Sequence, residues 1–318
     1  MTTPGVTFVI PTYNGAKRVD APLRALLDQQ AGSERFEVVV VDNNSTDGTA
    51  QVVEACSAVA GLRRRGVEVR IVSEPRQGLL FARLCGILSA RRDIVCFLDD
   101  DNVPESNFTT DGLAVFEDPS VGVVVSRLYP RYETPPPPSI ARREHLLAIN
   151  HRLGDAPIDF GAGATLAPTI GAGLWLRRAA FLSAVPWQTP EKLLPDRLGK
   201  QLLSSGDIEF GFLLGKAGHR RVYAPTLKVW HLIPSSRFET RYFLRLIVGV
   251  VRSEQTLRTR YLESDAAGHR GWVNGMRLLG ATLASPLLAL RGDPLREIPF
   301  VLASRWAQLL GPYPPTLR

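Results

Sequence analysis

The first hundred residues alternate between short apolar runs and segments whose apolar positions follow a helical spacing. The runs are rich in Val and Ile and cover residues 6–10, 36–41, 67–72 and 94–98. Helical spacing is found between them, at residues 22–30, 45–56 and 78–90. Near-continuous apolar strands that alternate with helices are typical of a parallel sheet covered on both faces. We therefore predict an α/β fold with a mostly parallel central sheet flanked by helices.

Polar side chains follow each of the four predicted strands at the point where the strand ends. They are Thr12, Tyr13 and Asn14, then Asp42 and Asn43, then Glu74 and Arg76, and finally Asp99, Asp100 and Asp101. In parallel sheets, ligands bind in the crevice beyond the carboxyl ends of the strands. The pattern therefore predicts one ligand site built from four strand ends.

The acidic triplet Asp99-Asp100-Asp101 is the most unusual of these groups. Three adjacent carboxylates repel one another unless a cation or strong donors compensate. Mg²⁺ or Mn²⁺ would do so, because these ions prefer hard oxygen ligands and keep positions open for phosphate oxygens. In an extended strand, Asp99 and Asp101 would project to one side and Asp100 to the other. The alternative is a solvated acidic turn.

The order of motifs along the chain resembles that of family 2 glycosyltransferases. The matching stretches are residues 9–14, 37–49, Gln77-Gly78 with Ala82-Arg83, and 97–101. The resemblance covers roughly residues 6 to 240. It implies a GT-A (nucleotide-diphospho-sugar transferase) fold, inverting sugar transfer and a nucleotide-diphospho-sugar donor.

The resemblance also implies roles for donor-side residues. The nucleotide-sugar would be held by Pro11, Thr12, Tyr13, Asn14, Asp42, Asn43, Gly78, Arg83, Asp99, Asp100 and Arg237. Many members carry Asp where this chain has Asn43, whose amide still hydrogen-bonds a base. Asp101 matches the metal-binding Asp, Asp99 completes the pair, Asp100 is left for the ribose, and His231 is a candidate third ligand. The expected cofactor is Mg²⁺ or Mn²⁺.

Inverting transfer needs a base that takes the proton of the acceptor hydroxyl. The family supplies it from a Glu-Asp motif that opens a helix, and here Asp207 takes the Asp position while Gly206 replaces the Glu. We expect Asp207 to be the general base, with Glu209 as the alternate. A helix N-cap is the structural alternative for Asp207. The acceptor loop of the family matches Gly171, Gly173 and Trp175, and we expect Trp175 or Trp187 to stack on a sugar face, with core packing as the alternative.

Two regions follow from these motifs. Residues 1–240 are expected to form the GT-A domain, with a nucleotide-sugar half at 1–115 and an acceptor half at 116–240. Residues 241–318 are expected to form a helical C-terminal extension, with apolar segments that begin at Trp272 and Phe300. Arginine-bordered amphipathic helices suit a membrane surface, core packing or a dimer interface. The acceptor is expected to be a saccharide or a lipid-linked molecule.

The amino-acid composition limits the classes of partner that the protein is expected to bind. The net charge of +7 favours anionic partners such as nucleotide phosphates or membrane surfaces, while no nucleic-acid motif is present, so no nucleic acid is expected. Three cysteines without a CxxC pair indicate a reducing compartment. No run of about 20 apolar residues is found. We expect a cytoplasmic protein, either soluble or at the inner face of the membrane.

Two other functions remain open from the sequence. A non-catalytic nucleotide-sugar-binding protein would share the fold, although Asp207 speaks against lost turnover. A nucleotidyltransferase also uses acidic metal sites on a related sheet. That class would carry a glycine-rich, basic phosphate loop, whereas the first loop here is residues 11–15 with only Lys17 and Arg18 after it.

Overall fold

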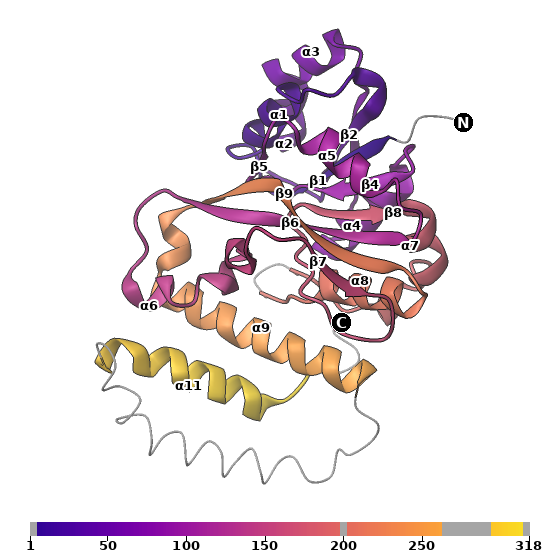
Figure 1. Cartoon of the computed structure of the whole chain (residues 1–318). Helices are drawn as coiled ribbons and strands as arrows, with labels where there is room; N and C mark the ends of the chain where they lie inside the picture. Colours follow the sequence, from indigo (N-terminus) through magenta and orange to yellow (C-terminus); the bar gives the residue numbers. More distant parts are fainter. Residues whose placement is uncertain (1–4, 198–201, 263–293, 314–318) are drawn as a thin grey trace. The chain divides into compact units, whose positions relative to one another are not determined.

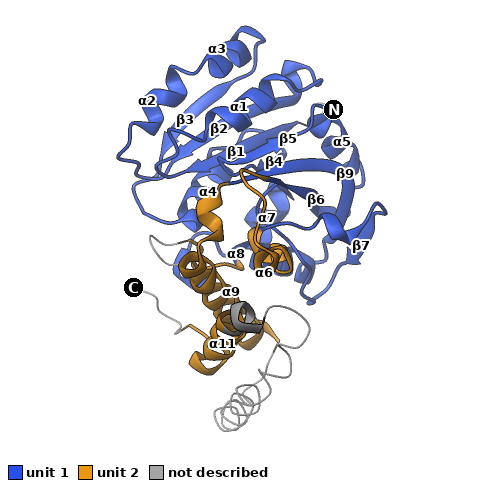
Figure 2. Ribbon diagram, turned by 90° about the vertical axis from the view of Figure 1, so that its left-hand side faces the viewer, with its two compact units in different colours: residues 1–131, 148–193, 206–233 blue, residues 132–147, 194–205, 234–318 orange. Residues whose placement is uncertain are grey.

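The computed structural model describes residues 5–197, 202–262 and 294–313. The chain divides into two compact units, coloured separately in Figure 2. Unit 1 comprises residues 1–131, 148–193 and 206–233, and unit 2 comprises residues 132–147, 194–205 and 234–318. The chain therefore leaves unit 1 twice before its C-terminal segment.

Unit 1 is built on one sheet, which has nine strands among the described residues and the order β3-β2-β1-β4-β8-β6-β9-β5, with β7 paired to β9 (Figure 1). The strands are β1 Val6–Thr12, β2 Phe36–Asp42, β3 Val69–Ser73, β4 Ile94–Phe97, β5 Asn102–Pro104, β6 Val121–Tyr132, β7 Ile158–Gly161, β8 Leu174–Arg177 and β9 Arg220–Ile233. All four strands expected in the first hundred residues are present.

Strand pairing in the sheet changes from parallel to antiparallel between β4 and β8. Strands β1 to β4 pair in parallel, with Thr12 opposite Asp42 at the ends of β1 and β2. Strand β8 is antiparallel to both β4 and β6, and β5 and β7 are antiparallel to β9. The α/β class with helices against the sheet is confirmed, and the parallel arrangement belongs to its first four strands.

Two hydrophobic cores cover the two faces of the sheet, because successive side chains of a strand point to opposite faces. Phe8 and Ile10 enter one core and Val9 the other, and all three are fully buried. The first core includes side chains of α1 Asp20–Leu27, α2 Thr49–Glu54, α3 Ser57–Arg64 and α5 Phe108–Val115. The second includes side chains of α4 Leu79–Ser89, α7 Arg178–Ala184 and α8 Gly206–Lys216. Both faces of the parallel part are therefore buried, as its apolar strands require.

Unit 2 is mainly helical. It contains α6 Pro138–Ala141, α9 Thr240–Tyr261 and α11 Pro294–Leu310, and α9 and α11 lie side by side (Figure 1). The rings of Phe243 and Phe300 meet edge to face between these two helices. Helices are thus present where the C-terminal extension was expected, while the apolar segment beginning at Trp272 lies outside the described residues. Short 3₁₀ turns occur in both units at Ser33–Arg35, Glu144–Leu147, His151–Leu153, Pro190–Lys192 and Ser235–Phe238.

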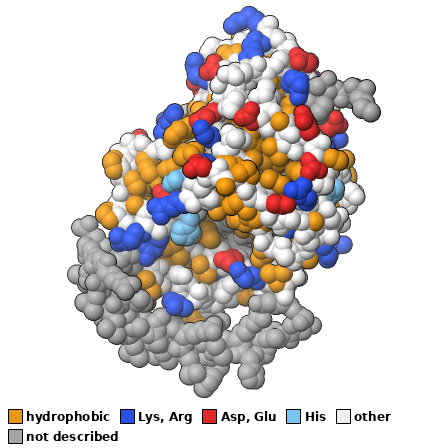
Figure 3. Space-filling view, viewed as in Figure 1, with side chains coloured by type: hydrophobic (Ala, Val, Ile, Leu, Met, Phe, Trp, Pro, Cys, Tyr) orange, Lys and Arg blue, Asp and Glu red, His pale blue; other side chains and the backbone are white. Residues whose placement is uncertain are grey.

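The helices and exposed side chains of unit 2 are relevant to the expected contact with a membrane surface. Within the part of the chain that the structure describes, no helix is both long and apolar enough to cross a membrane. Helix α11 exposes Leu302, Trp306 and Leu310, four residues apart along one stripe. In the upper part of Figure 3, Lys and Arg side chains are interspersed with Asp and Glu. Peripheral membrane contact, cytoplasmic location and the absence of nucleic-acid binding stay predictions.

Candidate active site

The first loop and the end of β2 are joined by side-chain hydrogen bonds. The Asn14 amide oxygen accepts the Thr46 N–H at 2.9 Å, and the Asn14 N–H donates to the Ser45 hydroxyl at 2.9 Å. Asn14 has a positive φ of 48°, which Asn tolerates better than most residues. Tyr13 is exposed beside it, whereas Pro11 is buried. Among the predicted base-binding groups of this region, Tyr13 is therefore the exposed one, and Asn14 and Asp42 are both half-buried.

Asn43 has a different role from the one expected. Its amide nitrogen donates to the carbonyl oxygens of Glu74 and Arg76 at 3.0 and 2.7 Å, and its amide oxygen accepts the Gly78 N–H at 2.8 Å. Both of its N–H donors are used by the loop before α4, and the residue is almost completely buried. The side chain holds this loop against β2 rather than facing a nucleotide base.

Gly78 makes the same loop possible. It precedes α4 with a φ of 137°, a backbone conformation that L side chains rarely adopt. The glycine lets the chain turn into the helix while its N–H points at Asn43. Its contribution is to the shape of the loop, and its predicted contact with the donor stays a prediction.

The acidic triplet lies in a tight turn and not in an extended strand. Strand β4 ends at Phe97, and the Asn102 N–H donates to the Asp99 carbonyl at 3.0 Å. The strand alternation used to separate Asp100 from its neighbours therefore does not apply. The separation arises from hydrogen bonds instead, because Asp100 accepts the Thr12 hydroxyl at 2.7 Å.

Arg18 is a site residue that sequence reasoning missed. Its Nε and Nη2 atoms donate to the two carboxylate oxygens of Asp100 at 2.9 and 2.8 Å. Burial raises the pKa of Asp100, and the bond from Arg18 opposes that rise. The sequence gives no reason to single out Arg18 for this pairing, because Lys17 beside it is equally basic and both side chains are exposed. Only the turn at Asp100 brings the carboxylate and the guanidinium together.

Asp99 and Arg83 form a second ion pair at the site. The Asp99 side chain is about one-third exposed, and the Arg83 Nη2 atom lies 3.8 Å from its Oδ1 atom. Desolvation by surrounding protein raises the pKa of Asp99, while the Arg83 charge lowers it. Arg83 itself is buried in α4, with its guanidinium over the Phe97 ring. A buried arginine here supplies fixed positive charge next to the triplet.

Asp101 and His231 are brought together by strand pairing. Asn102 of β5 pairs with His231 of β9, and the His231 Nε2 atom lies 3.4 Å from the Asp101 Oδ2 atom. Both residues are largely buried. Among the described residues, no three acidic, His or Cys side chains form a complete metal cluster. Carboxylate oxygens and an imidazole nitrogen nevertheless fit a divalent ion that completes its shell with phosphate oxygens and water.

Asp207 lies in the first turn of α8 and is oriented by backbone donors. Its Oδ2 atom accepts the Gly171 N–H at 2.6 Å, and its Oδ1 atom accepts the Ile208 N–H at 2.9 Å. Ser205, two residues earlier, has a φ of 77°, a strained conformation of the kind often found at functional sites. Glu209 is fully buried, whereas Asp207 is half-buried, so Asp207 is the more accessible carboxylate.

Gly171 connects the two sides of the site. A Cβ atom at this position would lie 2.0 Å from the Arg83 Nη2 atom, so the guanidinium packs directly on the glycine backbone. The same glycine donates its N–H to Asp207. Asp99, Arg83, Gly171 and Asp207 therefore form one continuous set of contacts within unit 1.

Trp175 does not lie where a sugar would stack. Its ring is fully buried in the first hydrophobic core, with centroids 5.7 Å from Phe8 and 5.0 Å from Phe108. The prediction of a sugar-stacking Trp175 is wrong, because β8 turns this side chain into the core rather than toward the loops. Gly173, just before β8, has a φ of 64° and its carbonyl accepts the Ser126 hydroxyl, which is consistent with a loop-shaping role.

Arg237 belongs to unit 2. Its Nη1 atom donates to the Tyr242 hydroxyl at 2.6 Å, and its guanidinium lies over the Tyr242 ring. Its predicted contact with the donor diphosphate, which would bring together two separately described units, stays a prediction.

Comparison with known proteins identifies the family of this chain. The model of the family described as glycosyl transferase family 2 matches residues 7–182, more than half of the chain. Glycosyltransferase AglE of Haloferax volcanii is 28% identical over 255 residues, covering 73% of this chain and 81% of AglE. Validoxylamine A glucosyltransferase of Streptomyces hygroscopicus subsp. jinggangensis is 30% identical over 161 residues, covering 48% of this chain and 36% of that enzyme.

Solved structures show the same fold. Mannosyltransferase PcManGT from Pyrobaculum calidifontis, in complex with GDP-Man and Mn²⁺, superposes with a TM-score of 0.63 at 19% identity, covering 96% of this chain and 86% of that one. GalNAc-T7 with UDP, GalNAc and Mn²⁺ gives 0.52 at 16% identity, covering 77% and 48% of the two chains. The matched family model and this shared GT-A fold agree with the motif order, and the chain belongs to glycosyl transferase family 2.

Proposed function

We propose that this glycosyltransferase is a metal-dependent, inverting enzyme that transfers a sugar from a nucleotide-diphospho-sugar to an acceptor hydroxyl. The acceptor would be a saccharide or a lipid-linked molecule of polysaccharide, glycolipid or other glycoconjugate synthesis. The observation that carries the proposal is the contact chain from Asp99 through Arg83 and Gly171 to Asp207. It joins donor-side carboxylates to a carboxylate suited to activate an acceptor.

The donor end would be held by the strand ends of the parallel half. Tyr13 and Asp42 flank the place expected for the nucleotide base, and Asp100 would meet the ribose while braced by Arg18 and Thr12. Asp101, Asp99 and the His231 Nε2 atom would hold Mg²⁺ or Mn²⁺. When bound, such an ion would supply positive charge to neutralise the diphosphate leaving group. PcManGT and GalNAc-T7 were solved with Mn²⁺ and nucleotide ligands, which supports this assignment.

The acceptor end would be activated by Asp207. A hydroxyl is a poor nucleophile until a carboxylate takes its proton, and direct displacement then inverts the anomeric carbon. The two backbone N–H bonds to Asp207 fix the carboxylate in one orientation. Fixing the base in this way reduces the reorganisation needed when the acceptor arrives.

A thermal-shift panel of UDP-, GDP- and dTDP-sugars with and without Mn²⁺ tests the donor half of the proposal. We expect one nucleotide to raise the melting temperature only when Mn²⁺ is present, because ligand binding to the native state stabilises it by mass action. Asp101→Asn should remove that metal-dependent shift. Asp118→Asn, an exposed carboxylate paired with Arg220, is the matched control and should retain it. A shift that is unchanged in Asp101→Asn would reject the metal assignment.

A further inference from the structure

Helix α11 has more apolar surface than unit 2 buries. Phe300 and Ala307, seven residues apart, are buried on one side of the helix. Leu302, Trp306 and Leu310 are exposed, and Trp306 keeps 57% of its surface accessible. Surface helices of globular proteins usually place polar residues outside their buried stripe. We propose that these three exposed residues, the α11 apolar face, dock unit 2 on the surface of an anionic lipid membrane.

The exposed side chains are of the kinds that suit the boundary between lipid and water. The indole of Trp306 combines a large apolar ring with an N–H donor, and such rings are enriched where membranes meet water. Leu302 and Leu310 lie four residues before and after it, so the three side chains form one stripe along the helix. A helix that lies parallel to a membrane surface can bury such a stripe without changing its own structure.

Arginines border the α11 apolar face. Arg305 is half-buried and directly precedes Trp306 in the helix. Arg252 of α9 donates from its Nε atom to the carbonyl oxygen of Gly311 at 3.1 Å, and this glycine directly follows Leu310. An arginine can lay its apolar stem along a hydrophobic surface while its guanidinium stays among polar groups. The stripe and its border therefore match the apolar and the charged layers of a membrane surface.

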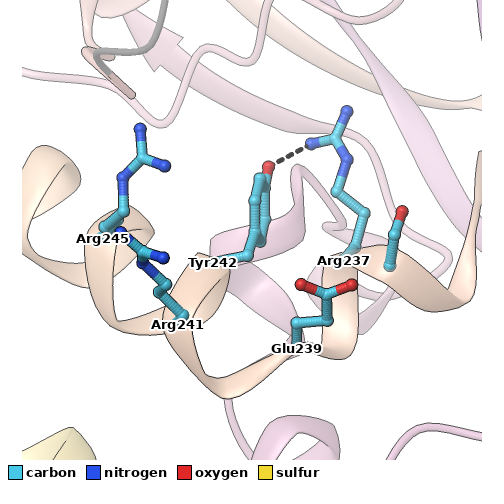
Figure 4. Close-up of a pocket in the computed structure, with 6 residues that line it drawn as sticks. Arg237, Glu239, Arg241, Tyr242 and Arg245 are labelled. Atoms are coloured by element: carbon cyan, nitrogen blue, oxygen red, sulfur yellow. Dashed lines mark hydrogen bonds between the residues drawn. The ribbon is translucent and has the colours of Figure 1, made fainter.

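The net charge of the protein lies in the same unit as the stripe. Unit 2 contains 16 Lys and Arg against 9 Asp and Glu, whereas unit 1 contains 22 of each, so unit 2 accounts for the whole +7. Helix α9 alone has five arginines and one glutamate, and Figure 4 shows Arg241 and Arg245 on its first turns. Attraction to anionic lipids adds to the burial of apolar surface when a basic amphipathic element binds a membrane. Unit 2 is therefore the part of the chain that an anionic membrane would attract.

The same charge distribution disfavours a contact between two copies of the chain. A symmetric dimer through the α11 apolar face would place this face of one copy against the same face of the other. Two units with a net charge of +7 each would then adjoin, and like charges repel. An anionic lipid surface covers the apolar side chains and also supplies the opposite charge.

Flotation of the full chain with lipid vesicles tests the docking. Phosphatidylcholine vesicles with added phosphatidylglycerol present an anionic surface, and phosphatidylcholine alone presents a neutral one. We expect the chain to float with the anionic vesicles and much less with the neutral ones. Raising the salt concentration should release it, because salt screens the attraction between exposed charges. Absence of flotation with the anionic vesicles would overturn the proposal.

Substitutions on α11 test whether its apolar face makes the contact. The double variant Trp306→Ser with Leu310→Ser should weaken partitioning to anionic vesicles by about tenfold or more, because two apolar side chains no longer enter the lipid. Leu88→Ser with Val52→Ser in unit 1 is the matched control, since Leu88 and Leu310 are both 44% exposed. The control should partition like the unchanged chain. Unchanged partitioning of the α11 double variant would overturn the proposal.

Trp306 also reports the contact directly. Lipids with brominated acyl chains quench the fluorescence of an indole that enters the apolar layer. We expect quenching in the unchanged chain and a clear reduction in Trp306→Phe, which keeps an apolar ring and should remain bound. Undiminished quenching in vesicle-bound Trp306→Phe would place the membrane contact elsewhere and overturn the assignment to α11.

Two further measurements identify other occupants of the face. Sedimentation velocity without vesicles would assign the face to a second copy if the unchanged chain is a dimer and the α11 double variant a monomer. Circular-dichroism melts would show that the chain itself covers the face if the α11 double variant melts well below the unit 1 control. Either result would overturn the proposal. These measurements need neither donor nor metal, so their outcome is independent of the proposed transfer reaction.

Discussion

The parallel and antiparallel parts of the unit 1 sheet hold their site residues in different ways. In the parallel part, polar groups follow consecutive strands and brace one another, as when Thr12 and Arg18 both bond to Asp100. In the antiparallel part, His231 reaches Asp101 through the pairing of β9 with β5. Parallel strands all end at one edge, so order along the chain is enough to gather groups there. Antiparallel strands bring in residues from distant segments.

The two sides also differ in what orients the functional carboxylates. Asp100 is fixed by a side-chain ion pair that is partly open to solvent. Asp207 is fixed by two backbone N–H donors after a residue with positive φ. One side-chain hydrogen bond to Asp100 can break while another remains, whereas the two backbone hydrogen bonds to Asp207 depend on the conformation of the whole loop. Changes on the acceptor side should therefore have larger and more selective effects on turnover than changes on the donor side.

The largest effect is expected from Asp207→Asn. An amide cannot take the acceptor proton, so kcat should fall by about 10²- to 10⁴-fold. The thermal shift given by the donor should remain, because the donor carboxylates are unchanged. Initial rates with donor and acceptor in excess, beside the donor titration, measure both quantities. Asp159→Asn, an exposed carboxylate paired with Arg220, serves as the control. Retained turnover in Asp207→Asn would move the base elsewhere.

An intermediate effect is expected from Asn43→Asp. The new carboxylate would face the carbonyl oxygens of Glu74 and Arg76, which now accept hydrogen bonds from the Asn43 amide. Losing two buried bonds should lower the free energy of unfolding by about 1–3 kcal/mol. Denaturant or thermal unfolding measures the change, and Asn44→Asp at the exposed neighbouring position is the control. Equal stability of the two variants would contradict the loop-holding role of Asn43.

The smallest effect is expected from Arg18→Gln. Asp100 would lose its two arginine bonds but keep the Thr12 hydroxyl. Because the Arg18 side chain is 44% exposed, solvent screens the pair, and the donor KM should rise by only about threefold to tenfold with kcat little changed. Arg24→Gln removes the same charge from an exposed pair with Asp20 and should leave KM unaltered. A fall in kcat alone would place Arg18 in the chemical step instead.

The sequence predicted most of the layout of the polar residues at the strand ends, while their roles toward a donor stay predictions. Apolar strands, helical spacing and polar strand ends placed Thr12, Asp42 and the triplet Asp99-Asp100-Asp101 at one edge, because period and order are local properties. The position of Asp207 at the start of a helix was also predicted from its motif. The predicted geometry of the triplet was wrong. Side-chain alternation requires an extended strand, and the chain forms a turn at Asp99 instead.

Tertiary structure decided the residues whose partners are distant in the chain. Trp175 looked suited to a sugar, but the pairing of β8 with β4 and β6 turned it into the core. Arg18 and Asn43 acquired their roles only when Asp100 and the loop before α4 were brought to them. By itself, the sequence determined which elements form and which polar groups stand at their ends, because these depend on neighbours in the chain. Contacts between separate strands decided which polar groups are available to a ligand and which stabilise the loops. No local sequence pattern encodes such contacts.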